Sequence, residues 1–261
     1  MTLPLFTAQS TAALLLQHWH SGERLQALPA ALKPETLSQG YDAQDQLFAA
    51  AGGRRVGWKL GVGSPAALRA GRLSRALVGQ LDAARCHGSG VHIQLPAPTP
   101  VTLECEVAFV LAHDVQPEPG RSPRPEDIRA TCVTFEVVRS RFVDRKSVGW
   151  PSFVADNVGF EALVIGEHVC AGIDAPLLER LAATAVVGVD GVPRARGLSG
   201  DGATDPLASL AALYAHAAER GEVLHAGDIV TTGAMCEPFD LVGTGHRVSV
   251  EYFGKELMLT L

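Results

Sequence analysis

The sequence predicts an α+β protein with a compact β core. Short β-rich runs dominate it, helical segments are few, and strands do not alternate regularly with helices, which argues against a doubly wound parallel sheet. With 261 residues and 47% apolar composition, the chain is long enough for one large domain or for a core domain with a smaller appendage. We expect an N-terminal helical cap in residues 1–80, which includes a lysine-bearing strand, and a β-rich catalytic core in residues 81–261.

The cap is expected to contain two helices and one strand. Residues 9–20 and 42–51 carry apolar residues at helical spacing, and a stretch that contains Pro29 and Pro34 separates them. Glycines flank a short β-rich run at residues 55–60, which we interpret as a strand between two turns.

The core is expected to be built from short strands and one late helix. The helix covers residues 206–220, with Asp205 as its N-cap, Pro206 at the first helical position and Gly221 after its end. The proline-rich stretch 117–125 is interpreted as a surface loop. Strands are predicted at residues 101–111, 131–138, 162–165, 185–189, 228–232 and 246–252.

Composition excludes several classes of protein. The formal net charge is -6 and no run is rich in lysine or arginine, so a nucleic-acid partner is not expected. No segment approaches the roughly 18 consecutive apolar residues that a membrane span requires. The uncharged N-terminal segment lacks the basic region of a signal peptide and is interpreted as a helix. The five cysteines never occur as CxxC, which favours reduced thiols in a cytoplasmic protein over disulfides or a zinc site.

Two glutamates in the run at residues 101–111 are the first candidates for a functional site. Side chains alternate between the faces of a strand, so Glu104 and Glu106 should point the same way while Cys105 points to the other face. Two carboxylates so close together repel each other unless a positive charge lies between them. A divalent cation would supply that charge. A solvated strand end, or arginines that pair with the glutamates, would explain the same pattern.

A third acidic residue favours a bound cation over a solvated strand end or arginine partners. Glu136 stands alone among apolar residues in the run at residues 131–138. Three carboxylates on neighbouring strands would form an all-oxygen site, for which Mg²⁺ is the expected ion and Mn²⁺ or Ca²⁺ the alternatives. The nine histidines are dispersed and form no HxH or HxxEH pattern that would indicate zinc.

Three further segments could complete a site. Lys59 lies in an apolar strand and needs an anionic partner, such as a substrate carboxylate, unless its side chain extends to water. Asp156 and Asn157 end an apolar stretch; Asp156 could orient Lys59 or a metal-bound water, and Asn157 could contact the substrate, but an Asx-turn explains the pair equally well. Thr232 and Gly233 end another strand, where a hydroxyl or a backbone N–H could meet a substrate carboxylate.

Six motifs in one chain order identify a family resemblance. They are Val56-Gly57-Trp58-Lys59-Leu60-Gly61, Leu103-Glu104-Cys105-Glu106, Phe135-Glu136-Val137-Val138, Ala155-Asp156-Asn157, Asp205-Pro206-Leu207 and Gly227-Asp228-Ile229-Val230-Thr231-Thr232-Gly233. Over nearly its whole length the chain resembles the fumarylacetoacetase-like superfamily, in its 2-oxopent-4-enoate hydratase and 4-oxalocrotonate decarboxylase branch. The resemblance implies a mixed β-sandwich or roll core with an N-terminal α/β cap, a divalent metal on the three glutamates, Lys59 in the active site, and a homo-oligomer.

The sequence departs from this branch at three places. An acidic stretch usually follows the lysine motif, but residues 73–79 contain Arg75 and no acid. Ser152 stands where an aspartate is usual, and residues 158–160 (Val-Gly-Phe) replace small polar residues. These differences bear on hydratase activity more than on the fold.

The resemblance implies a Mg²⁺-dependent lyase of aromatic meta-cleavage-type catabolism. Such an enzyme adds water to a 2-hydroxydienoate or 2-oxoenoate, or it decarboxylates a vinylogous 2-oxo diacid. Arg141 could bind the second carboxylate of that diacid, but an ordinary surface ion pair would explain this arginine equally well. Two alternatives stay open. One is a C–C bond hydrolase of the acylpyruvate or fumarylacetoacetate type, with a base such as His18 or His20. The other is a non-catalytic paralogue that binds a small acid.

Overall fold

The computed structural model describes residues 6–261. Its α-helices are α1 (Ala8–Ser21), α2 (Leu37–Ala50), α3 (Pro65–Gly71), α4 (Trp150–Ala155), α5 (Ala175–Thr184) and α6 (Pro206–Arg220). Short 3₁₀ turns are η1 (Ala30–Leu32), η2 (Ala83–Arg85), η3 (Pro125–Asp127), η4 (Asn157–Gly159) and η5 (Gly200–Gly202). Within residues 6–261, none of the helices combines the length and the hydrophobicity needed to span a bilayer.

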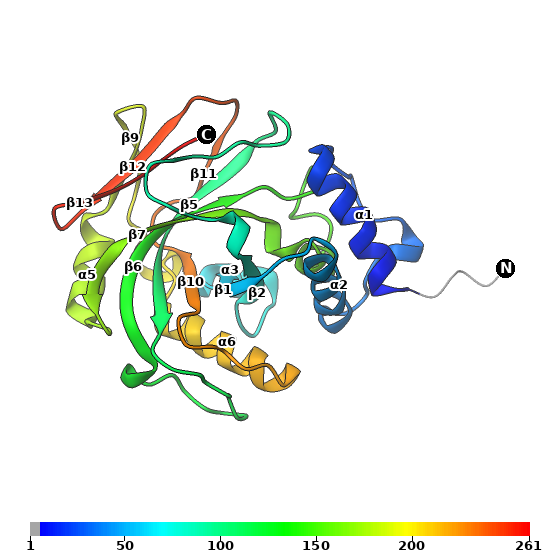
Figure 1. The fold of residues 1–261 in the computed structure, drawn as a ribbon, viewed down its shortest axis with the longest axis horizontal. Helices are drawn as coiled ribbons and strands as arrows, with labels where there is room; N and C mark the ends of the chain where they lie inside the picture. The colour runs from blue at the N-terminus through cyan, green and yellow to red at the C-terminus, as the bar shows by residue number, and fades with distance from the viewer. Residues whose placement is uncertain (1–5) are drawn as a thin grey trace.

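Two sheets form the body of the molecule (Figure 1). The larger sheet has the order β2 (Leu77–Asp82), β1 (Arg55–Gly61), β10 (Ile229–Ala234), β5 (Val101–Leu111), β6 (Ile128–Val138), β7 (Phe160–Ala171) and β3 (Cys86–Gly88), and β11 (Phe239–Leu241) also pairs with β5. The smaller sheet has the order β4 (Val91–His92), β13 (Lys255–Thr260), β12 (Arg247–Tyr252), β8 (Val186–Val189) and β9 (Val192–Arg196). The larger sheet curls, with α1 and α2 at one side and the smaller sheet at the other. The predicted α+β class is confirmed.

The predicted strands and the late helix are confirmed, but β7 extends well beyond the predicted 162–165, to Ala171. The carboxylate of Asp205 accepts hydrogen bonds from the N–H groups of Leu207 and Ala208, and Gly221 ends α6 at a φ of 67°. The second helix begins at Leu37, earlier than predicted, because Thr36 and Gln39 form a capping box. Three helices, α3, α4 and α5, are not predicted by the sequence pattern.

The lysine-bearing strand belongs to the large sheet. β1 runs parallel to β10 and antiparallel to β2. Its Gly57 has a φ of 154°, and a Cβ there would lie 1.9 Å from the carbonyl oxygen of Ile229. Only glycine allows this approach of the two strands, which places Lys59 beside Thr231 of β10. The division of the chain near residue 80 stays a prediction.

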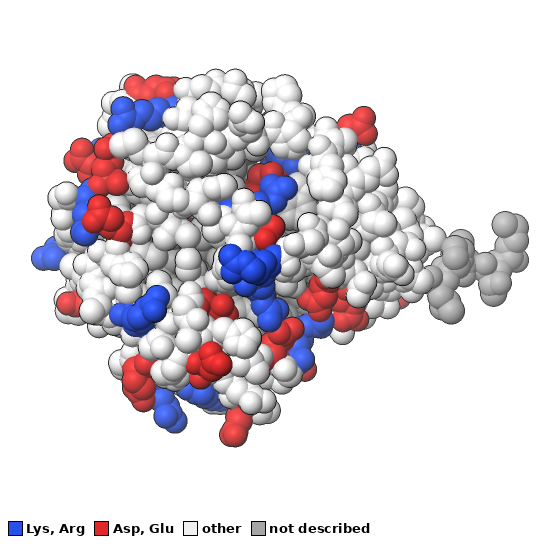
Figure 2. Space-filling view, in the orientation of Figure 1, with Lys and Arg blue, Asp and Glu red and all other residues white. Residues whose placement is uncertain are grey.

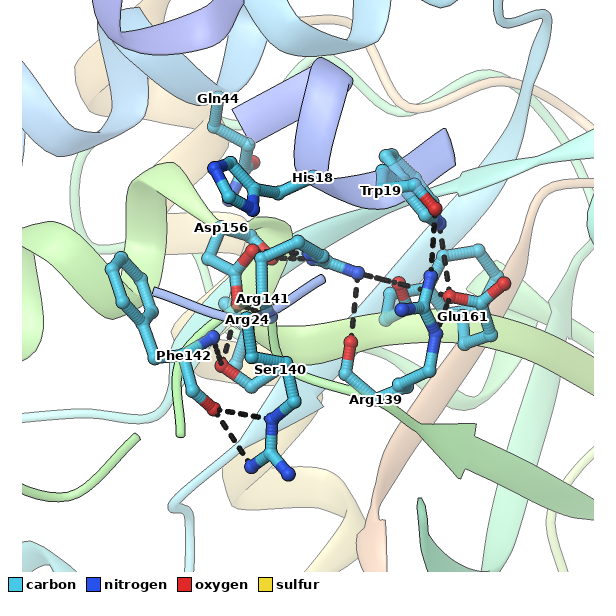
Figure 3. Close-up of polar contacts among 12 residues, drawn as sticks. His18, Trp19, Arg24, Gln44, Arg139, Ser140, Arg141, Phe142, Asp156 and Glu161 are labelled. Carbon is cyan, nitrogen blue, oxygen red and sulfur yellow. Dashed lines mark hydrogen bonds and ion pairs between the residues drawn. The ribbon is translucent and has the colours of Figure 1, made fainter. Parts of the chain in front are cut away.

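Buried charges connect α1 to the end of β6 (Figure 3). The Trp19 indole N–H donates to Glu161 Oε2 at 2.9 Å, and Arg139 Nε donates to the same oxygen at 2.9 Å. Arg85 and Arg141 both lie over the Trp19 ring, at 4.4 and 4.6 Å from its centroid. The indole therefore covers two guanidinium groups and fixes the position of α1 on the core.

Charges of both signs alternate over the face drawn in Figure 2, and the surface around the N-terminal helices is largely uncharged in this view. This face carries no broad basic surface, in agreement with the net charge of -6.

Candidate active site

Three glutamates converge on one face of the curled sheet. β5 and β6 pair so that Glu104 lies directly opposite Glu136, and Glu106 follows on the same face of β5. One carboxylate oxygen from each of the three residues lies within 4.8 Å of the others. Glu106 and Glu136 are fully buried, while Glu104 is half-buried. The strand register thus brings together the residues that the alternation of side chains predicted.

The electrostatics of this cluster fit a divalent cation. Burial raises the pKa of Glu106 well above its ordinary value, and the charges of Glu136 and Glu104 raise it further. Burial also raises the pKa of Glu136 to about 7, against the lowering effect of the Lys59 charge. Within residues 6–261, Glu106 Oε1 and Glu136 Oε2 have no hydrogen-bond partner. Unpartnered buried carboxylate oxygens are the donors that a hard cation binds.

Two hydroxyl groups on the same face extend this polar cluster. Thr134 lies opposite Glu106 in the sheet, and Thr231 lies opposite Ala108, one position further along the same face. Both hydroxyls are buried and lack a hydrogen-bond partner among the residues described. Neither threonine was predicted, because a lone threonine in a strand is ordinary β-sheet sequence.

Lys59 completes the charge balance. Its side chain is 2% exposed, and Nζ lies 2.9 Å from Glu136 Oε1. Nζ also donates a hydrogen bond to the carbonyl oxygen of Val158 at 3.1 Å. The lysine therefore does not extend to water, and its positive charge offsets one of the clustered carboxylates.

A cavity of about 470 Å³ opens over Lys59 and Glu104. Arg145 and Lys146, on the loop after β6, also line it. Arg145 is close enough to Glu136 for its charge to lower the pKa of that carboxyl, though less strongly than burial raises it. The remaining wall is apolar and is formed by Val62, Val138, Val158, Ala67, Ala70, Trp150 and Phe153.

Comparison with known proteins decides the family. Residues 67–258 match the family model of the fumarylacetoacetate (FAA) hydrolase C-terminal region. A 2-keto-4-pentenoate hydratase from Paraburkholderia phymatum is 30% identical over 233 residues, which are 87% of each chain. The chain belongs to the FAA hydrolase C-terminal family. The resemblance that the six motifs indicated is confirmed.

Further relatives of this FAA hydrolase family member agree in sequence and fold. A 4-oxalocrotonate decarboxylase from a Pseudomonas species is 26% identical over 204 residues, which cover 78% of this chain and 77% of the relative. The solved structure of 4-oxalocrotonate decarboxylase from Pseudomonas putida G7, complexed with magnesium and adipate, superimposes with a TM-score of 0.83 at 22% identity. That match covers 98% of both chains and shows a common fold.

Asp156 and Arg141 lie outside the cavity of this family member. The Asp156 carboxylate accepts hydrogen bonds from Ser140 Oγ at 2.7 Å, from the Arg141 N–H at 3.0 Å and from Arg141 Nε (Figure 3). Arg141 Nη1 donates to the carbonyl oxygens of Arg139 and Phe160, each at 2.9 Å. Both side chains are fully buried and saturated with internal partners. The structure therefore does not bring Asp156 to Lys59 or Arg141 to a substrate carboxylate.

The other predicted contacts to substrate also serve the fold. The Asn157 side chain accepts from the Gln80 N–H at 2.8 Å and donates to the Gln80 carbonyl at 2.9 Å. The Thr232 hydroxyl donates to the Val107 carbonyl, and the Gly233 N–H donates to Glu106 Oε2 at 3.0 Å. Thr232 and Gly233 line a separate cavity of about 190 Å³. Gly233 thus orients a candidate metal ligand and lies away from the Lys59 cavity.

The residues that take the place of Arg141 at the cavity are Arg145 and Lys146. Both belong to the basic cluster after β6, which is visible in the sequence together with Arg139 and Arg141. The sequence does not show which member of that cluster faces inward. In the structure, the earlier two arginines turn toward Glu161 and Asp156, and the loop that follows carries the later two to the cavity.

Two strained valines line the same cavity. Val62 has a φ of 59° and Val158 a φ of 52°, in the left-handed region that β-branched residues rarely adopt. Such conformations cost on the order of 1–3 kcal/mol each and persist where the surrounding structure enforces them. At Val158 the conformation presents the carbonyl oxygen to Lys59 Nζ.

Breaking the pair of Arg141 and Asp156 should destabilise the fold and leave the metal ligands in place. Arg141→Met leaves the Asp156 carboxylate buried and unpaired, for which a loss of about 3–5 kcal/mol is expected. Arg69→Met is the matched control, since the exposed pair of Arg69 and Asp201 contributes only about 0–1 kcal/mol. Denaturant unfolding measures both losses. Equal losses in the two variants would show that the buried pair has no special role in stability.

Proposed function

We propose that this protein is a divalent-metal-dependent lyase that adds water to a small 2-oxoalkenoate. The observation that carries the proposal is the convergence of Glu104, Glu106 and Glu136 beside the buried Lys59, at a cavity that Glu104 and Lys59 line. The hydratase from Paraburkholderia phymatum supports the reaction type. The proposal includes a cytoplasmic homo-oligomer, Mg²⁺ as the resident ion and Mn²⁺ or Ca²⁺ as replacements; magnesium and calcium accompany the decarboxylase from Pseudomonas putida G7 in its structures.

The chain would hold the ion through the three glutamates. The Gly233 N–H fixes one oxygen of Glu106, which leaves the other free to bind the cation. When bound, a divalent cation supplies Lewis-acid stabilisation of negative charge that develops on the 2-oxo oxygen of the substrate.

Lys59 and Arg145 would handle the substrate and its protons. Lys59 Nζ, held by Glu136 and by the Val158 carbonyl, can donate to the substrate carboxylate or deliver a proton to the carbon chain as the enol becomes a ketone. Arg145 on the cavity wall can bind the same carboxylate. Water then adds across the alkene, with its hydroxyl on one carbon and its proton on the neighbouring carbon, and gives a 4-hydroxy-2-oxo acid.

A second candidate reaction is decarboxylation of a vinylogous 2-oxo diacid. The 4-oxalocrotonate decarboxylase relative at 26% identity favours it, and loss of CO₂ leaves the same enolate for the site to stabilise. The metal cluster serves either reaction, so the products must separate them.

Turnover should depend on a divalent cation. A 2-hydroxydienoate tests for hydration, and an unsaturated 2-oxo diacid tests for decarboxylation. Each is incubated with the protein either in Mg²⁺ or in excess chelator, and the loss of substrate and the mass of the product are measured. We expect Mg²⁺-dependent consumption of the dienoate to a hydroxylated 2-oxo acid, with a rate at least about 100-fold lower in chelator. Release of CO₂ would mark the decarboxylase, and two carbonyl fragments a hydrolase. Unchanged substrates, with stabilisation by Mg²⁺ alone, would indicate a binding protein and refute the proposal.

A further inference from the structure

The charges in the Lys59 cavity are distributed unevenly. Lys59 Nζ lies 2.9 Å from Glu136 Oε1, and the positive charge of Arg145 is also close enough to stabilise the Glu136 carboxylate. Lys146 follows Arg145 on the same exposed loop. Every basic group that lines the cavity therefore comes from β1 or from the loop after β6. A carboxylate that binds in the cavity is expected at this part of it.

The wall formed by α3 and α4 offers no charge at all. Helix α4 contains no charged residue, and Ala67 and Ala70 are the α3 side chains that face the cavity. The one charged residue of α3, Arg69, pairs with Asp201 at the surface at 2.5 Å. A second carboxylate placed against this wall would lose its hydration without gaining a partner.

The aromatic residues of this wall present carbon only. Nε1, the single polar atom of the Trp150 side chain, donates a hydrogen bond to the Gly71 carbonyl oxygen at 2.8 Å. Its ring lies 6.3 Å from that of Phe153, centroid to centroid, and both rings line the cavity. The hydrogen bond holds the indole in place, so an apolar surface is already formed before any ligand arrives.

Two further apolar side chains are held at the cavity against their backbone preference. Val62 and Val158 adopt the left-handed conformations described above, and a glycine at either position would relieve the strain. Their side chains extend the apolar wall toward Lys59. The volume of about 470 Å³ also falls within the range of roughly 300–1,000 Å³ found for sites of drug-sized ligands.

We propose that the site selects 2-oxo monocarboxylic acids that carry an extended apolar tail, alkyl or aryl, and rejects 2-oxo dicarboxylates of the same length. The tail packs between Trp150, Phe153 and the two valines, while the 2-oxo acid end lies at the basic side of the cavity. This inference rests on the proposed function, because it takes the 2-oxo acid group and its cation as given. It names the substrate class that the wall accepts.

Binding of unreactive saturated acids tests the inference without turnover. Titration calorimetry in saturating Mg²⁺ compares 2-oxohexanoate with 2-oxoadipate, which differ only in a terminal methyl or carboxylate group. We expect 2-oxohexanoate to bind at least about tenfold more tightly. Within the series pyruvate, 2-oxobutanoate, 2-oxopentanoate and 2-oxohexanoate, each added methylene should tighten binding by up to about fourfold.

A charge placed in the wall should reverse the preference. Ala67→Arg adds a guanidinium to the half-buried α3 position and should tighten 2-oxoadipate and weaken 2-oxohexanoate, each by about fivefold or more. Ala66→Arg, on the same helix and exposed outside the cavity lining, is the matched control and should leave the ratio unchanged. Should Ala67→Arg fail to fold, the wild-type comparison still decides.

Failure of the inference and failure of the proposed function look different. If 2-oxoadipate binds the wild type as tightly as 2-oxohexanoate or more tightly, the apolar-tail inference is overturned, and Mg²⁺-dependent binding of both acids still supports the proposed function. If none of the acids, pyruvate included, binds in the presence of Mg²⁺, the 2-oxo acid site itself is refuted and the inference falls with it.

Discussion

Replacing Glu106 by glutamine should abolish stabilisation of the protein by Mg²⁺ and should not weaken the metal-free fold. Wild-type protein at a hundred times the dissociation constant of the ion gains about 2.7 kcal/mol, a rise in Tm of several degrees for a chain of this size. The variant lacks one of the three metal ligands and therefore cannot hold the ion. It also has one carboxylate fewer in the buried cluster, so the repulsion among these negative charges in the metal-free protein is reduced. Activity should fall by at least about 100-fold.

Thermal unfolding with and without Mg²⁺ measures this effect, and an exposed glutamate supplies the control. Glu126→Gln changes the net charge equally, but its side chain is 64% exposed and lies outside the cluster. It should keep the full Mg²⁺ response. A Glu106→Gln protein that still gains several degrees in Mg²⁺ would show that the ligand assignment is wrong.

Replacing Lys59 by methionine should lower the activity and raise the affinity for Mg²⁺. Activity should fall by about 10²–10⁴-fold, because the group that binds or protonates the substrate is lost. Affinity for Mg²⁺ should rise, by about tenfold or more, because the ammonium at 2.9 Å from Glu136 competes with the cation for that carboxylate. Without metal, the variant should be less stable by about 3–5 kcal/mol, since Glu136 is left buried without its partner.

Calorimetry with Mg²⁺ and unfolding of the metal-free protein check the Lys59 prediction. Lys146→Met is the matched control, because Lys146 lines the same cavity from an exposed position where solvent screens its charge. It should change neither Mg²⁺ affinity nor stability appreciably. A weaker Mg²⁺ affinity in Lys59→Met would mean that Lys59 supports the cation site instead of competing with it.

Strand patterns made the metal cluster predictable. Glu104 and Glu106 interrupt an apolar run at the period of a strand, and Glu136 does the same in the next run. The two runs are neighbours in sequence and are therefore expected to pair in an antiparallel sheet, where a shared face brings the acids together. Lys59 was found for a similar reason, since a lone charge in an apolar strand requires an opposite charge.

The sequence could not predict the partners of the other buried charges. Arg141 and Arg145 belong to the same basic stretch after β6, but one is fully buried against Asp156 and the other lines the cavity. That choice depends on Trp19, which covers Arg141 from a distant helix. Short helices were missed for a different reason, because α3 and α4 extend for only 7 and 6 residues, too few to show a hydrophobic period. The strained φ angles of Val62 and Val158 contradict local preference and follow only from tertiary packing.

The Trp19 indole, over which Arg85 and Arg141 both lie, ties the first helix to the buried ion pairs of the core. A truncated polypeptide that starts at residue 31 would retain all three metal ligands and Lys59. It would nevertheless expose the carboxylate of Glu161 and the cations around it to water, which removes the low-dielectric setting of those ion pairs. Proteolytic clipping ahead of residue 31 should therefore inactivate the molecule from a distance, through loss of cooperative folding and with its chemical groups intact.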